Sequence, residues 1–247
     1  MSLLKAFFLS FSFLTNIPFS LFLHFDYQEK DFRRSIIFFP IIGFFIGIIN
    51  ISIYYLLYSF FSSSVNILII LFFQYLLFNL FHFDGFLDFF EAILSGKKNS
   101  DDIMRIMKDP RIGSIGLFIG MIYILIKVSL LKELYLYPII LFFYPIVGRL
   151  SQVLLMGIFP ISQKANLGLL FRDIPILFTF VSYILGISLF LIYPKSLLIA
   201  VVSSFLASLF VGLIAYRKIG GSTGDVIGAS NELGEILFLL FSLLFYI

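Results

Sequence analysis

The sequence predicts an all-α membrane protein, a polytopic helical bundle with about seven spans and a range of six to eight. Hydrophobic residues make up 61% of the 247 residues and charged residues only 13%, against roughly 45–50% and about 25% in soluble domains. So few charges could not cover the surface of a soluble globule of this length. Several apolar runs reach roughly 20 residues, the length at which a helix crosses about 30 Å of hydrocarbon. We expect one integral-membrane domain over residues 1–247.

The predicted spans follow one another without a linker or an internal repeat. Lys127 lies inside the third run and is expected to snorkel to the membrane surface, and Arg149 lies inside the fourth. The stretch 1–25 is broken by Pro18 and lacks a small-residue cleavage pattern, so it predicts an interfacial or re-entrant helix rather than a signal peptide. The expected spans are 35–61, 65–83, 112–131, 134–159, 174–194, 196–216 and 225–247.

The distribution of basic residues predicts the orientation in the membrane, because loops rich in Lys and Arg stay on the cytoplasmic side. If the loop 83–111 is cytoplasmic, most of the 17 basic residues lie inside, and Lys127, Lys132 and Lys195 lie outside. In the same orientation, nearly all the acidic residues lie on the cytoplasmic side of the membrane. We therefore expect a multi-pass protein of the cell (inner) membrane whose active site faces the cytoplasm.

Composition also limits the chemistry and the partners. The chain has no cysteine, which excludes disulfides, thiolate metal sites and cysteine nucleophiles. A net charge of only +3 leaves no electrostatic footprint for nucleic acid, so no nucleic-acid partner is expected. Membrane lipid and small molecules are the expected partners, and the sequence leaves the oligomeric state open.

A first acidic cluster lies at the end of the second predicted span. Asp84, Asp88 and Glu91 are spaced i, i+4 and i+7, so they share one face of a helix. Like charges at a membrane edge repel unless a cation lies among them, and hard oxygen ligands select Mg²⁺, Mn²⁺ or Ca²⁺. The alternative is a solvated helix end. His82 precedes the cluster and is expected to support it through hydrogen bonds.

A second acidic cluster opens the last predicted span. Asp225, Gly228, Glu232 and Glu235 are spaced by three, four and three residues, again on one helical face. The glycine-rich stretch before them starts the helix, so its free backbone N–H groups and the helix dipole predict a phosphate site. The alternative is a flexible hairpin with an N-cap threonine. The residues of the predicted phosphate site are Gly221, Ser222, Thr223 and Gly224.

Two arginines complete the candidate site. Arg149 is expected in the cytoplasmic third of its span. There it either binds a phosphate or a carboxylate of the site, or it is a structural arginine that snorkels to the membrane surface. Arg111 follows Asp109 and Pro110 at the end of the long loop, which indicates either a site residue or a loop-to-helix turn. Together these features predict metal-assisted phosphoryl transfer, with one uncoordinated carboxylate as general base.

The sequence resembles the cobalamin-5′-phosphate synthase family, also called adenosylcobinamide-GDP ribazoletransferases, over nearly its whole length. The most specific motifs are His82-Phe-Asp-Gly-Phe-Leu-Asp88 and the stretch from Gly221 to Glu235. Further similarity lies in residues 13–18, 34–43, 47, 106–113 and 148–149.

The resemblance implies a reaction and a set of residue roles. It implies that adenosylcobinamide-GDP is joined to α-ribazole or its 5′-phosphate, giving adenosylcobalamin or its phosphate and GMP, with Mg²⁺ as cofactor. By position it implies Asp84, Asp88, Glu91 and Asp225 as metal ligands, and Asp84, Asp88 and Arg149 as catalytic residues. The implied phosphate or substrate contacts are Arg149, His82, Arg111, Gly221, Ser222, Thr223 and Gly224.

Two other functions compete with this interpretation. A CDP-alcohol phosphatidyltransferase also uses an acidic ladder at a membrane helix end, but its Ala-Arg after Asp-Gly and its further aspartates do not match this chain. An ion-coupled transporter is expected to bind near the bilayer midplane between repeats, and no repeat is visible here.

Overall fold

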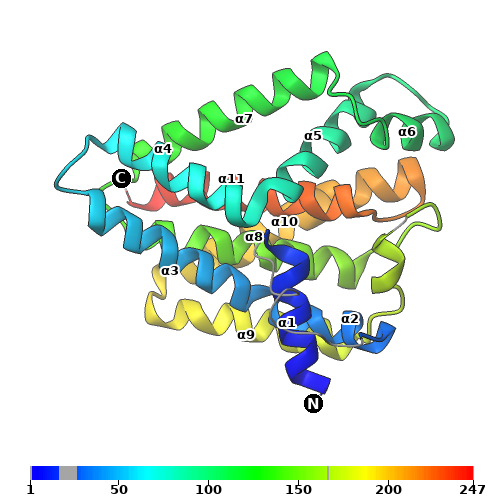
Figure 1. Ribbon diagram of the computed structural model, residues 1–247, viewed down its shortest axis with the longest axis horizontal. Helices are drawn as coiled ribbons and strands as arrows, with labels where there is room; N and C mark the ends of the chain where they lie inside the picture. The colour runs from blue at the N-terminus through cyan, green and yellow to red at the C-terminus, as the bar shows by residue number, and fades with distance from the viewer. Residues whose placement is uncertain (1, 17–26, 166, 247) are drawn as a thin grey trace.

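The computed structural model describes residues 2–16, 27–165 and 167–246. Within these ranges the chain folds into a bundle of helices and forms no β-strand (Figure 1). Short 3₁₀ turns cover Ile36–Phe38, Leu167–Phe171 and Leu189–Ile192, and a π turn covers Tyr75–Asn79. The helices are α1 (Ser2–Leu14), α2 (Glu29–Ser35), α3 (Phe39–Leu57), α4 (Ser63–Gln74), α5 (Leu80–Leu94), α6 (Ser100–Met107), α7 (Ser114–Glu133), α8 (Ile139–Ile158), α9 (Ile176–Ser188), α10 (Lys195–Ile219) and α11 (Gly224–Tyr246).

Six of the described helical segments are long and apolar enough to cross a membrane, which confirms a multi-pass all-α bundle. Two shorter apolar helices, Leu3–Leu14 and Ile176–Ile192, bring the total within the predicted six to eight. The second half of the predicted interfacial or re-entrant stretch lies outside the described residues. The six segments are Glu29–Leu57, Ser63–Leu94, Ser114–Glu133, Ile139–Ile158, Lys195–Ile219 and Gly224–Phe245.

One predicted boundary is wrong. The span expected to end at Phe83 continues as helix to Leu94, so the supposed loop 83–111 begins with more than two helical turns. The acidic residues that follow Phe83 therefore lie on the wall of a long helix, and the connection to α7 is made by α6 and short loops.

Helix α8 forms the centre of the bundle, and 89% of its most apolar 18-residue stretch is buried inside the protein. Helices α3 and α9 lie on one side of it and α11 on the other (Figure 1). Helix α3 approaches closely because it carries glycine at the crossing: a Cβ atom on Gly47 would lie 2.3 Å from the Phe142 carbonyl oxygen. Small residues of this kind allow close backbone contact between membrane helices.

A proline inside α8 leaves a backbone carbonyl that the buried side chain of Asn50 binds. Pro145 has no N–H group, so the carbonyl of Leu141 loses its helical partner. The Asn50 side chain of α3 donates to that carbonyl at 3.3 Å, and it also donates to Gln74 at 2.9 Å. A free carbonyl is costly inside a membrane, and this contact explains why α3 carries a buried asparagine.

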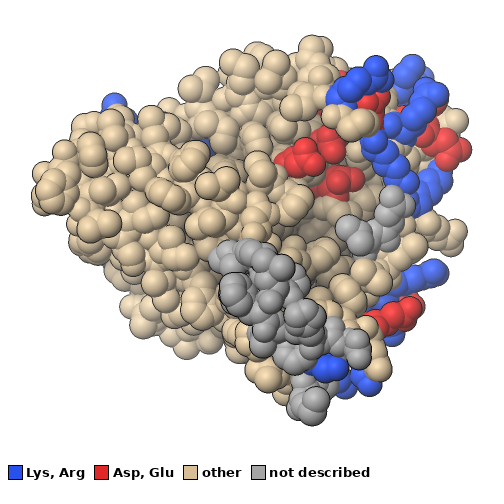
Figure 2. Space-filling model, viewed as in Figure 1, with Lys and Arg blue, Asp and Glu red and all other residues tan. Residues whose placement is uncertain are grey.

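The charged side chains gather at one end of the bundle (Figure 2). In the view of Figures 1 and 2, basic residues cover the end that holds α6 and the start of α11, whereas uncharged residues cover most of the remaining visible surface. This asymmetry is the pattern that the positive-inside rule associates with a cytoplasmic end.

Candidate active site

The candidate site lies where α5 crosses α11. A Cβ atom on Gly85 would lie 2.7 Å from the Asp225 Cα atom, so the two backbones touch and only glycine fits. The crossing also brings Gly228 against the backbone of His82. It places Asp84 and Asp88 next to Asp225, although these residues are far apart in the sequence.

We call Asp84, Asp88 and Asp225 the acidic site. Asp84 is exposed, whereas Asp88 and Asp225 are half-buried. Asp88 interacts electrostatically with Asp84, Asp225 and Glu91, and Asp225 also interacts with Asp84. Acidic side chains gather over this crossing on the surface seen in Figure 2. In the described ranges, no three Asp, Glu or His side chains are arranged to hold a metal ion together, so the carboxylates are neighbours without forming a closed cage.

Two cavities meet at Asp88. One has a volume of about 400 Å³ and is lined by Asp88, Asp225, Gly224 and Lys108 among others. The other has a volume of about 410 Å³ and is lined by Asp88, Glu91 and Arg111 among others. Asp88 and Asp109 line both. The acidic site is therefore bordered by a cavity on each of two sides.

Glu91 does not join the acidic site as the sequence predicts. Its carboxylate accepts a hydrogen bond from the Gly116 N–H in the first turn of α7, and it packs against Gly113 at the start of that helix. A carboxylate is stabilised there by the free N–H groups and the positive end of the helix dipole. In this structure Glu91 caps α7, and its role as a metal ligand stays a prediction.

Arg111 lies at the mouth of the second cavity, paired with a neighbour. Its guanidinium donates to both carboxylate oxygens of Asp109, at 2.9 and 2.6 Å, and its backbone N–H donates at 3.1 Å. These hydrogen bonds lower the pKa of the Asp109 carboxyl to about 2, so Asp109 stays ionised at neutral pH. Arg111 is therefore near the predicted site, but its charge is already balanced.

The predicted phosphate loop is used mainly for packing. The Ser222 N–H donates to the Pro160 carbonyl at 2.8 Å, and the Ser222 carbonyl accepts from the Ser162 N–H at 2.9 Å. The Thr223 hydroxyl caps α11 by accepting from the Val226 N–H. Of the four predicted residues Gly221, Ser222, Thr223 and Gly224, Gly224 is the one exposed, and it lines the cavity beside Asp225. Thr223 and Gly224 both line that cavity, and the phosphate contacts of the four residues stay a prediction.

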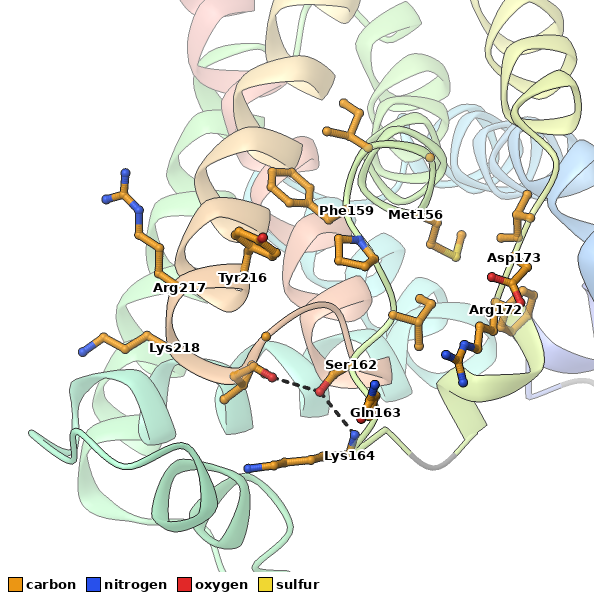
Figure 3. Close-up of a pocket in the computed structure, with 18 of the residues that line it drawn as sticks. Met156, Phe159, Ser162, Gln163, Lys164, Arg172, Asp173, Tyr216, Arg217 and Lys218 are labelled. Carbon is orange, nitrogen blue, oxygen red and sulfur yellow. Dashed lines mark hydrogen bonds between the residues drawn. The ribbon is translucent and has the colours of Figure 1, made fainter.

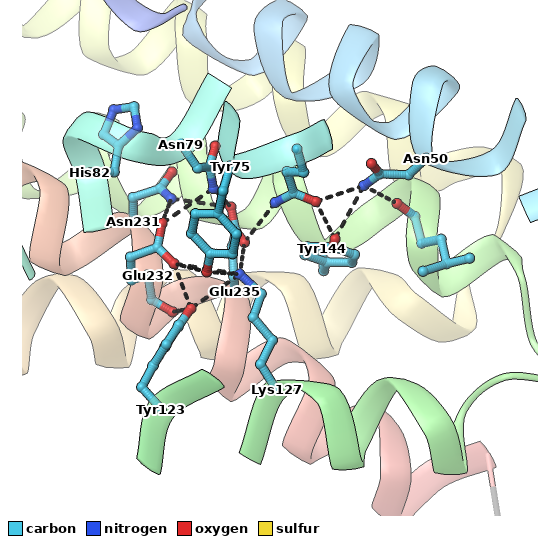
Figure 4. Close-up of polar contacts among 12 residues, drawn as sticks. Asn50, Tyr75, Asn79, His82, Tyr123, Lys127, Tyr144, Asn231, Glu232 and Glu235 are labelled. Atoms are coloured by element: carbon cyan, nitrogen blue, oxygen red, sulfur yellow. Dashed lines mark hydrogen bonds and ion pairs between the residues drawn. The ribbon is translucent and has the colours of Figure 1, made fainter. Parts of the chain in front are cut away.

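Lys127 does not snorkel, and that prediction is wrong. Its side chain is fully buried, and its ammonium lies 2.6 Å from Glu235 and 3.4 Å from Glu232 (Figure 4). It also donates to the hydroxyls of Tyr75 and Tyr123. The ion pair joins α7 to α11 in the interior, where an unpaired charge would be expensive.

The second acidic cluster is likewise divided. Asp225 joins the acidic site, whereas Glu232 and Glu235 turn into the bundle, so the expectation that they lie at the membrane edge is wrong. The side chains of Asn79 and Asn231 each donate to both glutamates, at 2.9 to 3.2 Å. Further donors to the two glutamates are Gln74, Tyr75 and Tyr123.

Arg149 belongs to the same interior group. It is fully buried, and it donates to Asn79 and Asn231 at 3.0 Å and lies 3.0 Å from a ring nitrogen of His82. Neither Arg149 nor His82 lines the two cavities at Asp88. The geometry therefore favours a positioning role for both over the predicted direct contact with phosphate. We call Lys127, Arg149, Glu232, Glu235 and the side chains that hydrogen-bond them the buried network.

The buried network is attached to the acidic site through the start of α5. The π turn that precedes α5 begins at Tyr75 and ends at Asn79, and both residues bond the buried glutamates. A π turn contains one extra residue and is frequent at functional sites. Since it sets the rotation of the helix that follows, it also sets the direction of Asp84 and Asp88.

Sequence reasoning missed the place of Lys108 in this geometry and misjudged that of Lys127. Lys108 lines the cavity at Asp225 and interacts electrostatically with that carboxylate. The signal for it was its position two residues before Pro110 in the loop 106–113. Lys127 offered a signal only through its charge inside an apolar run, which does not reveal a partner.

Comparison with known proteins yields a consistent match. A family described as cobalamin-5-phosphate synthase matches residues 6–243. The chain is similar to an adenosylcobinamide-GDP ribazoletransferase of Clostridium botulinum (strain Okra / Type B1), with 34% identity covering 98% of this chain and 99% of that one. It is also similar to the protein of that name from Clostridium tetani, with 34% identity over all of both chains, and from Clostridioides difficile, with 31% identity over 96% of each. No solved structure matches.

Proposed function

The chain belongs to the cobalamin-5-phosphate synthase family, and we propose that it joins adenosylcobinamide-GDP to α-ribazole or its 5′-phosphate, releasing GMP. The name of its relatives supports the two substrates. The geometric observation that carries the proposal is the pairing of Asp88 with Asp225, which line one cavity beside the start of α11 while Asp88 also faces a second cavity. One substrate can thus reach each side of the same carboxylate.

We propose Mg²⁺ as cofactor, with Asp84, Asp88 and Asp225 as its ligands; since these carboxylates are neighbours without forming a closed cage, their side chains would have to close around the ion when it binds. The donor set suits this ion, because it consists of hard carboxylate oxygens from two helices, with no thiol in the chain. The electrostatic interaction of Asp88 with neighbouring carboxylates supports a bound cation. When bound, Mg²⁺ would neutralise diphosphate charge and ease departure of the nucleotide.

The protein's own groups supply the remaining steps. The ribazole hydroxyl oxygen attacks the phosphorus attached to the cobinamide arm, and the bond from that phosphorus to the GMP oxygen breaks. A carboxylate of the acidic site that is free of metal accepts the hydroxyl proton. Gly224 and Asp225 lie in the first helical turn, where backbone N–H groups point away from the helix and can receive phosphate oxygens. Lys108 adds a positive charge to the same cavity.

We place this site on the cytoplasmic face of the cell (inner) membrane. The concentration of basic side chains at the end that holds the acidic site supports this orientation (Figure 2). The soluble nucleotide donor and the released GMP would then be exchanged with the cytoplasm.

Purified protein is expected to release GMP from adenosylcobinamide-GDP only when α-ribazole or its phosphate and Mg²⁺ are both present. EDTA should abolish the release, and added Mg²⁺ should restore it. Coupled detection of GMP and of the corrinoid product by chromatography measures both halves of the reaction. The proposed function fails if folded protein makes neither product at saturating Mg²⁺.

Arg149→Lys is expected to lower the melting temperature and kcat while the KM for the GDP-linked donor stays near wild type. Lysine keeps the charge but cannot donate to Asn79 and Asn231 with a planar fork. Loss of a buried charge-assisted hydrogen bond costs about 1.5–3 kcal/mol. Melting temperature and donor KM should be measured on one preparation. A large rise in donor KM with an unchanged melting temperature would instead indicate direct phosphate binding.

A further inference from the structure

A basic cavity of about 960 Å³ lies at the charged end of the bundle, beside the acidic site (Figure 3). Residues 156–164, 171–174 and 216–220 form most of its wall. One acidic side chain, Asp173, lines it against four basic ones. The basic residues are Lys164, Arg172, Arg217 and Lys218.

Three of these cations are available to bind an anion. Among the described residues, Arg172, Arg217 and Lys218 form no ion pair, whereas Lys164 is paired with Asp101. Figure 3 shows Arg172 on one side of the loop that carries Ser162, and it shows the other two on the opposite side, at the end of α10. Basic side chains therefore lie on both sides of this loop, and Arg217 and Lys218 extend away from it (Figure 3).

A thin wall separates this basic cavity from the acidic site. It consists of the loop 160–165 and the turn 220–223, joined by the two hydrogen bonds between Ser222 and the backbone of Pro160 and Ser162. Gly220 lines the basic cavity, and Gly224 lines the cavity with Asp225. The two cavities are therefore neighbours on either side of this wall.

The two cavities favour different phosphate groups. We call the cavity of about 400 Å³ beside Asp225 the acidic cavity. It is lined by the carboxylates of Asp88, Asp109 and Asp225 and by the single ammonium of Lys108, so a phosphate there is repelled unless a metal ion binds it. The family description refers to a cobalamin phosphate, and such a product carries a phosphate that takes no part in the transfer. A non-reacting dianion of this kind needs a basic site outside the acidic cavity.

We propose that the basic cavity binds the phosphomonoester of a phosphorylated ribazole acceptor, while the attacking hydroxyl of the same molecule lies in the acidic cavity. This inference rests on the proposed function. It assigns Arg172, Arg217 and Lys218 to recognition of the acceptor phosphate, because Arg and Lys are the side chains that bind phosphate by charge-assisted hydrogen bonds.

The test compares two acceptors that differ only in the phosphate. In Arg172→Gln, and separately in the double variant Arg217→Gln/Lys218→Gln, the ratio of KM for α-ribazole 5′-phosphate to KM for α-ribazole should rise by roughly ten- to a hundredfold, as expected for losing a charge-assisted contact. Lys98→Gln is the matched control, since it removes an exposed charge that does not line the cavity. Its ratio should equal that of the wild type.

Direct binding separates this inference from the proposed function. Calorimetry on the detergent-solubilised full chain should show tighter binding of α-ribazole 5′-phosphate than of α-ribazole, and the advantage should shrink in both cavity variants. An unchanged KM ratio, an equal change for both acceptors, or a change confined to the donor KM overturns the inference even when GMP release is normal. Equal binding of the two acceptors by the wild type overturns it even when no transfer is detected.

Discussion

Asp84→Asn is expected to reduce Mg²⁺-dependent GMP release by roughly 10²–10³-fold, the loss typical of removing one group that stabilises transition-state charge. The substitution keeps the side-chain shape and removes one negative charge from the acidic site. Asp84 is exposed and interacts with the Asp88 and Asp225 carboxylates, so its loss should weaken metal binding without opening the core. Turnover should be measured over a Mg²⁺ titration.

The sign of the stability change distinguishes a site residue from a structural one. Removing a like charge relieves repulsion, so the melting temperature of metal-free Asp84→Asn should equal or exceed that of the wild type. Asp102→Asn is the matched control, because Asp102 lies at the same end but pairs with Arg105. Wild-type turnover in Asp84→Asn at limiting Mg²⁺ would show that this carboxylate does not contribute to the site.

The fold could be predicted from the sequence because the signals for membrane helices are local. Uncharged runs identify spans through their length alone, and the last expected span, 225–247, nearly coincides with α11 at Gly224–Tyr246. The second span was predicted too short because the acidic residues after Phe83 end the uncharged run, although their i, i+4 and i+7 spacing already indicates a helical face. The local pattern does not reveal that this continuation packs against α11 and α7.

The candidate site could be predicted only in part. The i, i+4 spacing correctly placed Asp84 and Asp88 on one helix wall, but it did not reveal that Glu91, on the same face, caps α7. Helical spacing reports a shared face and not the depth or the neighbour that the face meets. For the same reason, Glu232 and Glu235 were grouped with Asp225 although they lie in the interior.

Lys127 illustrates the limit most clearly. A lysine in an apolar run reaches the membrane surface when its helix is considered alone. In the bundle, two glutamates from α11 lie within 3.4 Å of its ammonium and keep the charge inside. Such a pairing between distant segments cannot be inferred from one sequence without knowing which helices are neighbours.

Lys127→Met is expected to destabilise the protein by about 3–5 kcal/mol, the usual effect of removing one partner from a buried ion pair. Methionine fills a similar volume but leaves Glu232 and Glu235 without the cation nearest to them, with Arg149 as the remaining positive charge of the buried network. Asn79 also binds these glutamates, so the disturbance should reach α5 and reduce transfer activity as well. Melting temperature, membrane yield and GMP release measure the three effects.

A second substitution tests whether charge balance is the cause. Glu235→Gln removes the negative charge nearest to Lys127, so the double variant Lys127→Met/Glu235→Gln should recover much of the melting temperature lost in Lys127→Met, and the two changes should be strongly non-additive. Lys132→Met, on the exposed end of the same helix, is the control and should change stability little. If Lys127→Met melts at the wild-type temperature, or if the double variant is as unstable as the sum of the two single ones, the buried ion pair does not hold α7 against α11. In that case the rotation of α5, and with it the direction of Asp84 and Asp88, depends on the other contacts of Tyr75 and Asn79, among them the hydrogen bond that Arg149 donates to Asn79.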